Sequence, residues 1–296
     1  TSTTGYYNGI TPPSGGYTIY LNKATGGPSI YTCANDTELV NLTNSIAGTS
    51  YTTANECFTY CAGQNDKMVL NRDYEGIVTD GLILDWDVGF IPSYPKNGSI
   101  IRDLSGSNSD GNIYNGVSYD SNNGGSLVFD GSDDDVYPST DLSSLPSGDS
   151  ARTMMYWIYP YSLSSTILRQ IAGWGLDNGR GNLFCGIIYS NGKAGLWGNS
   201  INYQSTHNIT NNTWQHIAYV KTPGNIVCYK NGVADSGGSL TLNTVTNSRP
   251  YMGKVYNKNI YSLYTGRIGN FLIYDRDLSS TEILQNFNAQ KGRFGL

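Results

Sequence analysis

The side chains of this sequence that could carry out chemistry are mainly carboxylates, because the chain holds 23 acidic residues and two histidines. Hydrolysis of a glycosidic bond requires two carboxyl groups, one on either side of that bond. Asp85 and Asp87 share one face of a predicted strand, but acid–base chemistry has few other groups to draw on. The glutamates are scattered along the chain: Glu38, Glu56, Glu75 and Glu282. We therefore predict that the protein is not an enzyme, and we interpret the two aspartates as groups that solvate turns and strand edges.

Aromatic residues near turn-rich segments point to a second chemistry, the recognition of sugars. In such sites an aromatic ring stacks on the face of a sugar while amide and backbone groups orient its hydroxyls. Aromatic residues of a β sandwich also fill its core or its interfaces, so both roles stay open at this point. The candidate glycan-binding residues are Trp174, Tyr189, Trp197 and Tyr203.

Clustered aspartates at 130–135 and 275–277 offer the ligands that Ca²⁺ prefers, since this ion takes six to eight oxygen atoms. Asp130 and Asp275 each directly end a predicted strand, so we name them as the candidate ligands of a structural Ca²⁺. Neither segment has the spacing of a dedicated calcium loop, and aspartates in turns also cap backbone N–H groups. The sequence predicts no other cofactor.

Composition limits the class of protein. Gly occurs 36 times and Tyr 24 times among 296 residues while only 14% are charged, which favours many short strands joined by polar turns. A net charge of -5 and a pI near 4.9 argue against nucleic acid as a partner. No stretch approaches the roughly 20 apolar residues that would span a bilayer. The start of the sequence also lacks the charged and apolar regions of a signal peptide.

The periodicity of the residues divides the chain into two parts. A Gly/Pro-rich arm over 1–16 precedes short strands and two helices, which are predicted to begin near Asn35 and Thr53. From residue 80 the pattern is that of β strands about ten residues apart, typified by the alternating run 214–222 and the turn 223–225. A closing helix is predicted to begin at Ser279. We therefore predict a small α+β attachment module over 1–79 and a two-sheet antiparallel sandwich over 80–296.

Four segments in the second part resemble the concanavalin A-like, laminin-G-like jelly-roll superfamily. They are Gly-Ser-Leu-Val-Phe-Asp-Gly-Ser at 125–132, Trp-Gln-His-Ile-Ala-Tyr-Val at 214–220, Tyr-Lys-Asn-Gly at 229–232 and the run 268–283. Their order along residues 80–296 implies this fold. The fold carries lectins, glycosidases, adhesion modules and virion parts, so the resemblance does not specify a function.

The N-terminal segments 4–17 and 71–82 are similar to structural proteins of tailed phages, particularly large myophages. This resemblance implies a protein of the virion surface, assembled in the host cytoplasm, that decorates the capsid or forms part of a fibre or tail appendage. The implied partners are other virion proteins, in an oligomer or lattice, together with host-surface glycans. The alternatives are a lectin-like adhesin that recognises a receptor and a glycoside hydrolase.

Overall fold

The computed structural model describes residues 17–21, 29–33, 35–53, 56–57, 68–71, 76–90, 92–162, 168–246, 248–254 and 263–296. The N-terminal part of this set holds a three-stranded antiparallel sheet in the order β2-β1-β3, together with a 12-residue helix. These elements are β1 (Tyr17–Leu21), β2 (Ser29–Cys33), α1 (Asp36–Ala47) and β3 (Met68–Asn71).

Helix α1 begins where the sequence predicts. The side chain of Asn35 accepts a hydrogen bond from the backbone N–H of Glu38, and Gly48 ends the helix in the left-handed conformation. At the second predicted start, the side chain of Glu56 accepts bonds from the backbone N–H groups of Thr52 and Thr53. The rest of that predicted helix, with Cys61, and the arm over 1–16 lie outside the described residues.

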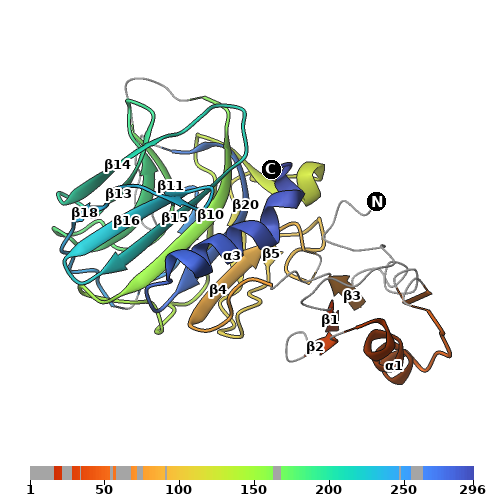
Figure 1. The fold of residues 1–296 in the computed structure, drawn as a ribbon. Helices are drawn as coiled ribbons and strands as arrows, with labels where there is room; N and C mark the ends of the chain where they lie inside the picture. Colours follow the sequence, from red (N-terminus) through yellow and green to blue (C-terminus); the bar gives the residue numbers. More distant parts are fainter. Residues whose placement is uncertain are drawn as a thin grey trace.

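Two larger antiparallel sheets pack face to face (Figure 1). The described residues place nine strands in the first, in the order β17-β16-β15-β10-β20-β8-β7, with β18 beside β16 and β4 beside β20. The second, an eight-stranded sheet, has the order β14-β13-β12-β11-β19-β9-β6-β5. We call them the nine-stranded and the eight-stranded sheet.

The strands of the nine-stranded sheet are β4 (Leu82–Asp87), β7 (Ser118–Asp120), β8 (Ser126–Asp130), β10 (Arg152–Pro160), β15 (Gln215–Thr222), β16 (Asn225–Lys230), β17 (Val233–Ala234), β18 (Gly238–Ser239) and β20 (Thr265–Tyr274). Those of the eight-stranded sheet are β5 (Ile100–Ile101), β6 (Gly111–Tyr114), β9 (Asp135–Pro138), β11 (Arg169–Gly175), β12 (Leu183–Ile188), β13 (Lys193–Trp197), β14 (Asn202–Asn208) and β19 (Tyr251–Met252). A short 3-10 turn, η1 (Asn122–Gly124), precedes β8.

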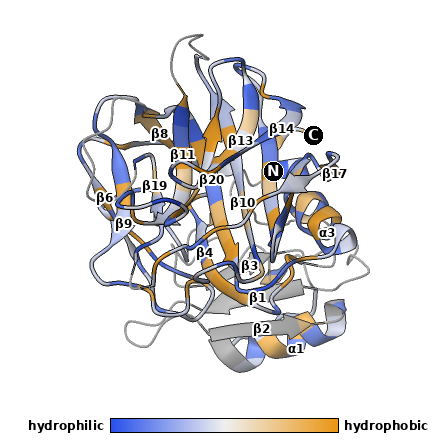
Figure 2. Cartoon of the chain, turned by 90° about the vertical axis from the view of Figure 1, so that its left-hand side faces the viewer, coloured by the Kyte–Doolittle hydropathy of each residue, from blue (hydrophilic) through white to orange (hydrophobic). Residues whose placement is uncertain are grey.

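Strand β15 lies inside its sheet, between β10 and β16, as its two apolar faces predict. Ile217 and Tyr219 point into the core between the sheets, whereas Ala218 and Val220 belong to a cluster on the outer face. The hairpin to β16 closes with Thr222 opposite Asn225. In Figure 2 the strands of the sandwich carry both hydrophobic (orange) and hydrophilic (blue) segments.

Helix α3 (Ser280–Lys291) and the short turn η2 (Gly292–Phe294) cover the outer face of the nine-stranded sheet (Figure 1). A reciprocal capping box between Ser279 and Glu282 starts the helix, as predicted. Ile283 packs with Leu272 on this face, and Phe294 stacks on Trp157 with ring centroids 4.1 Å apart. The C-terminal segment thus buries one outer surface of the sandwich.

The mainly β sandwich preceded by a small α+β element confirms the predicted fold class. The division of the chain at residues 79 and 80 stays a prediction. Residues just before it contact the sandwich: the Val78 N–H donates to Asn286 Oδ1 at 2.7 Å, and the Tyr274 hydroxyl donates to the Val78 carbonyl at 2.8 Å. Within the described residues, no helix combines the length and apolar character that a membrane crossing would need.

Candidate functional site

The outer face of the eight-stranded sheet is built by alternation along β12. Phe184 and Ile188 point into the core, whereas Leu183, Cys185 and Ile187 point the other way into a second apolar cluster. The partly buried members of this outer cluster are Tyr137, Leu168, Tyr189 and Trp197. Aromatic rings therefore border the outer face, partly open to solvent.

Tyr189 and Trp197 lie together on this face because of the register of β12 and β13. Trp197 pairs with Cys185 and Gly195 pairs with Ile187, so both positions face outward. The ring of Tyr189 lies over Gly195, where any side chain would collide with it. Burial raises the pKa of the Tyr189 hydroxyl, which keeps it a neutral hydrogen-bond donor. These two rings are the predicted glycan-binding residues that the structure places on this face.

Amide side chains border the two rings. Trp197 pairs with Asn202 and Gly195 pairs with Gln204 across the β13–β14 ladder, and both polar residues are exposed. Asn191, in the turn between β12 and β13, donates from Nδ2 to Oε1 of Gln204 at 3.3 Å. Each amide offers donors and acceptors to a ligand above the rings. We call Tyr189, Trp197, Asn191, Asn202 and Gln204 the aromatic–amide strip.

A second aromatic group on the same face was missed by the sequence reasoning. Tyr114 of β6 and Tyr137 of β9 stack with ring centroids 4.4 Å apart, and both are partly exposed. The paired positions Asn112–Tyr137 and Ile113–Val136 put Tyr137 outside and Val136 inside. The alternation of Asp135, Val136 and Tyr137 was the signal that could have found it.

Gln170 of β11 is a buried polar residue on this outer face, since it pairs with Ile187. It is fully buried, and neither its Oε1 nor its Nε2 has a hydrogen-bond partner within the part of the chain that the structure describes. An unpaired amide in an apolar setting costs free energy that a bound polar group recovers. Because the Gln170 side chain is fully buried, however, a ligand on the face does not reach it, and we leave it out of the candidate site.

Two of the four predicted glycan-binding residues do not lie on this surface. Trp174 is fully buried in the core, where its Nε1–H donates to the Pro146 carbonyl at 3.0 Å. Tyr203 pairs with Leu196, points inward and donates its hydroxyl to Asp235. The prediction was wrong for both, because nearness to a turn does not decide which face of a strand a residue occupies.

The candidate metal ligands Asp130 and Asp275 lie apart. Asp130 pairs with Thr265 at the start of β20, whereas Asp275 follows Tyr274 at its end. The ten residues of this strand separate them by about 30 Å at about 3.3 Å per residue. The two residues cannot bind one ion, and a shared site is excluded.

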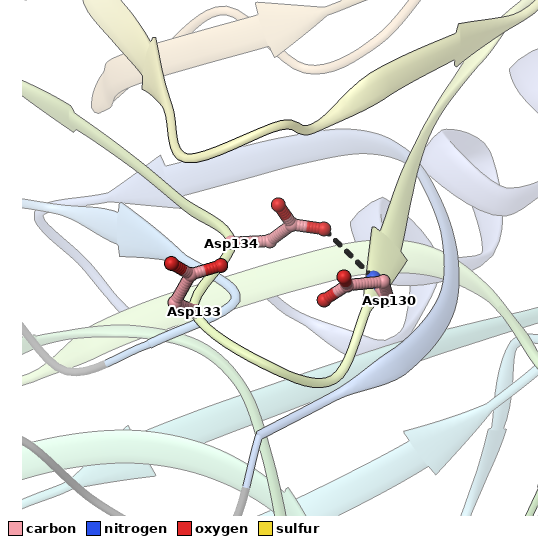
Figure 3. A group of neighbouring side chains, drawn as sticks. All are labelled: Asp130, Asp133 and Asp134. Carbon is pink, nitrogen blue, oxygen red and sulfur yellow. Dashed lines mark hydrogen bonds between the residues drawn. The ribbon is translucent and has the colours of Figure 1, made fainter.

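Asp130 instead lies with Asp133 and Asp134, whose ligand atoms are within 4.8 Å of one another (Figure 3). Part of this arrangement is explained by the turn, because Asp134 Oδ2 accepts from the Asp130 N–H at 2.7 Å and Asp130 Oδ1 accepts from the Ser132 N–H at 2.7 Å. Burial raises the pKa of Asp134 to about 6. The group has the oxygen ligands of a cation site, and its hydrogen bonds also hold the turn together.

Asp85 and Asp87 are held by contacts within the protein. Asp85 is buried, and burial together with the charges of Asp87 and Asp103 raises its pKa well above the usual range. Asp87 forms an ion pair with Arg293 of η2. The ion pair between Asp87 and Arg293 therefore fixes the C-terminal segment against β4. Neither aspartate faces an open surface.

Comparison with known proteins identifies the family. Residues 129–284 match the concanavalin A-like lectin/glucanases superfamily. The chain belongs to this superfamily. A search of curated proteins gave no match.

Solved structures share the fold of this superfamily member at low sequence identity. Domain 4 of AbnA, a GH43 extracellular arabinanase from Geobacillus stearothermophilus, solved in complex with arabinotriose, is 19% identical with a TM-score of 0.53, covering 71% of this chain and 98% of that one. The binding domain of Paraclostridial Mosquitocidal Protein 1 is 19% identical with a TM-score of 0.56, covering 71% and 52%. A Trypanosoma rangeli sialidase in complex with sialic acid is 18% identical with a TM-score of 0.54, covering 73% and 34%. The present chain thus spans about a third of the sialidase chain.

These comparisons correct one prediction. The count of carboxylates led us to predict that the protein is not an enzyme, and that exclusion was wrong because the chain shares its fold with an arabinanase domain and with part of a sialidase. The number of glutamates in one domain does not separate it from glycosidase chains. The likeness at this level of identity concerns the fold and assigns no reaction to this chain.

Proposed function

We propose that the protein binds carbohydrate on the outer face of its eight-stranded sheet. The observation that carries this proposal is that Tyr189, directly after β12, and Trp197 of β13 lie on the same face, partly exposed and bordered by amides. Membership of a lectin and glucanase superfamily supports it. Aromatic rings supply the apolar contact that a sugar face needs, and amides pair with its hydroxyls.

A glycan array followed by titration calorimetry tests this proposal. The intact chain is expected to bind at least one glycan, and Trp197→Ala is expected to weaken that binding by about tenfold or more, equivalent to about 1.4 kcal/mol. Leu284→Ala is the matched control, because this exposed apolar residue lies on α3 over the other sheet. Equal loss in both variants, or binding unchanged in Trp197→Ala, would place the ligand elsewhere.

We propose further that the chain displays this sandwich on a phage virion surface, on a capsid, fibre or tail appendage, with residues 1–79 contacting other virion proteins. The resemblance of the N-terminal segments supports this role. The three-stranded sheet before the sandwich is separate from the two larger sheets, which supports separate roles: attachment for the N-terminal part and binding for the sandwich.

Truncation tests the attachment proposal. Because Val78 is hydrogen-bonded to α3 and β20, the cut belongs before residue 76. The fragment 76–296 is expected to keep the circular dichroism and glycan affinity of the sandwich but to be lost from purified particles that incorporate the full chain. Normal incorporation of the folded fragment would contradict the proposal.

A further inference from the structure

The aromatic–amide strip has a charge character that restricts its ligand. The outward side chains of the edge strand β14 are all uncharged and exposed: Asn202, Gln204, Thr206 and Asn208. Across β12, β13 and β14 the charged side chain is that of Lys193, whose Nζ donates to the Thr206 carbonyl at 3.1 Å. On these three strands the rings therefore have neutral hydrogen-bonding neighbours, and the nearby charge of Asp177, which acts on Cys185 and Tyr251 of this face, is negative.

The proteins that bind anionic polymers use a different set of groups. Carboxylate, sulfate and phosphate are recognised by arginine forks or by clusters of cations. Here Lys193 and Lys230 both reach the edge strand β14, and each already donates to a backbone carbonyl, at Thr206 and at Asn208. The whole chain carries a net charge of -5, so its long-range field repels a polyanion at neutral pH.

Neutral hydroxyls fit the strip better. An amide donates and accepts at once, as a hydroxyl does, so Asn191, Asn202 and Gln204 can each satisfy a sugar hydroxyl in either sense. The raised pKa of Tyr189 adds a neutral phenol to this set. The ring of Trp197, set on the adjacent strand, offers the apolar surface for a pyranose or furanose face.

We propose that the ligand of the aromatic–amide strip is an uncharged glycan and that the strip discriminates against anionic polysaccharides. This inference rests on the carbohydrate-binding function proposed above. The discrimination arises because an anionic group placed over the strip loses its water and gains no free cation from β12, β13 or β14 in return.

The experiment uses the full chain on an array of neutral and anionic glycans, with dextran and dextran sulfate as a pair that shares one backbone. We expect the tightest ligand to be neutral and its Kd to change less than about twofold between about 50 and 500 mM salt, since no ion pair is screened. Tyr189→Ala and Trp197→Ala are expected to lose about tenfold or more. Gln204→Lys is expected to raise the affinity for anionic glycans.

The outcomes separate the two proposals. Tightest binding to an anionic glycan, weakened by salt and by Trp197→Ala, would overturn the neutral preference and leave carbohydrate binding at this face in place. Binding of a neutral glycan that is unaffected by Tyr189→Ala, Trp197→Ala and Gln204→Lys would overturn the assignment to the strip. An array with no bound glycan of either kind would overturn both proposals.

Discussion

The two outer faces of the sandwich use aromatic residues for different purposes. On the nine-stranded sheet, Trp157 and Trp214 are buried under α3 and η2, packed against Phe294. On the eight-stranded sheet, Tyr189 and Trp197 stay partly exposed beside amides. One sheet face is therefore closed by the chain's own C-terminal segment, while the other keeps its aromatic border available. A tryptophan on an outer face of this fold therefore has a structural role where another segment covers it, and it is free to contact a ligand where no segment does.

The largest expected effect is a loss of folding stability at low pH, and it arises on the nine-stranded face. His216 is fully buried between Trp157 and Phe287, and both of its ring nitrogens lack a hydrogen-bond partner among the described residues. Burial lowers its pKa from 6.5 to about 3. The unfolded chain therefore binds more protons between these pH values, so the stability contributed by neutral His216 is present above pH 6.5 and is lost as the pH falls toward 3.

The size of this effect follows from the shift in pKa. At about 1.4 kcal/mol per unit, the loss reaches roughly 4 to 5 kcal/mol at pH 3. Urea unfolding from pH 7 to pH 4 is the measurement, with His216→Leu as the variant whose slope against pH is expected to be flatter than that of the parent chain. Parallel slopes in the two proteins would show that this imidazole is not held neutral under α3.

Removal of one tryptophan from each face sharpens the comparison. Trp157 is fully buried and its Nε1–H donates to Gln290 Oε1 at 2.8 Å, so Trp157→Ala is expected to cost about 3 to 5 kcal/mol of unfolding free energy. Trp197 is only partly buried, so Trp197→Ala is expected to cost about 1 to 2 kcal/mol. The order is expected to reverse for glycan affinity, which Trp157→Ala leaves unchanged under conditions where it is folded. A larger stability loss in Trp197→Ala would contradict the assignment of the two faces.

A smaller effect is expected at the start of α3. Glu282 is hydrogen-bonded to Arg276 and to the Ser279 N–H, and these bonds lower its pKa to about 2. Ser279→Ala removes one half of the capping box and is expected to cost about 1 kcal/mol. Thermal unfolding measures the loss, and glycan titration of the same variant is expected to give the parent Kd. A change in Kd would mean that α3 contributes to the binding face.

Much of the fold could be predicted from local patterns. The capping residues Asn35 and Ser279 begin helices as their spacing indicates, and the alternation of 214–222 predicts the strand that the structure shows at Gln215–Thr222. These features depend on neighbours within a few residues, so the sequence displays them directly. The polar residues Asn202, Gln204 and Thr206 alternate with Tyr203, and this local pattern indicates that Tyr203 faces inward, as it does.

The candidate site was harder to predict because it depends on pairings between distant segments. A register shift between Gln170 and Ala172 sets which residues of β11 face the core, and Trp174 follows inward from it. The pairing of Asp130 with Thr265 separates the two predicted metal ligands by the length of β20. Neither the irregularity nor the pairing has a local signature, since strand register is decided by the packing of the whole face.

Hydrogen exchange of the intact chain, with and without the array glycan that binds most tightly, tests most directly whether the eight-stranded sheet carries the binding face. Added protection is expected to be concentrated in residues 183–208, which contain β12, β13 and β14. Residues 280–294 of α3 and η2 are expected to exchange at the same rate in both states. Protection gained at 280–294, with 183–208 unchanged, would contradict the assignment of the binding face to the eight-stranded sheet.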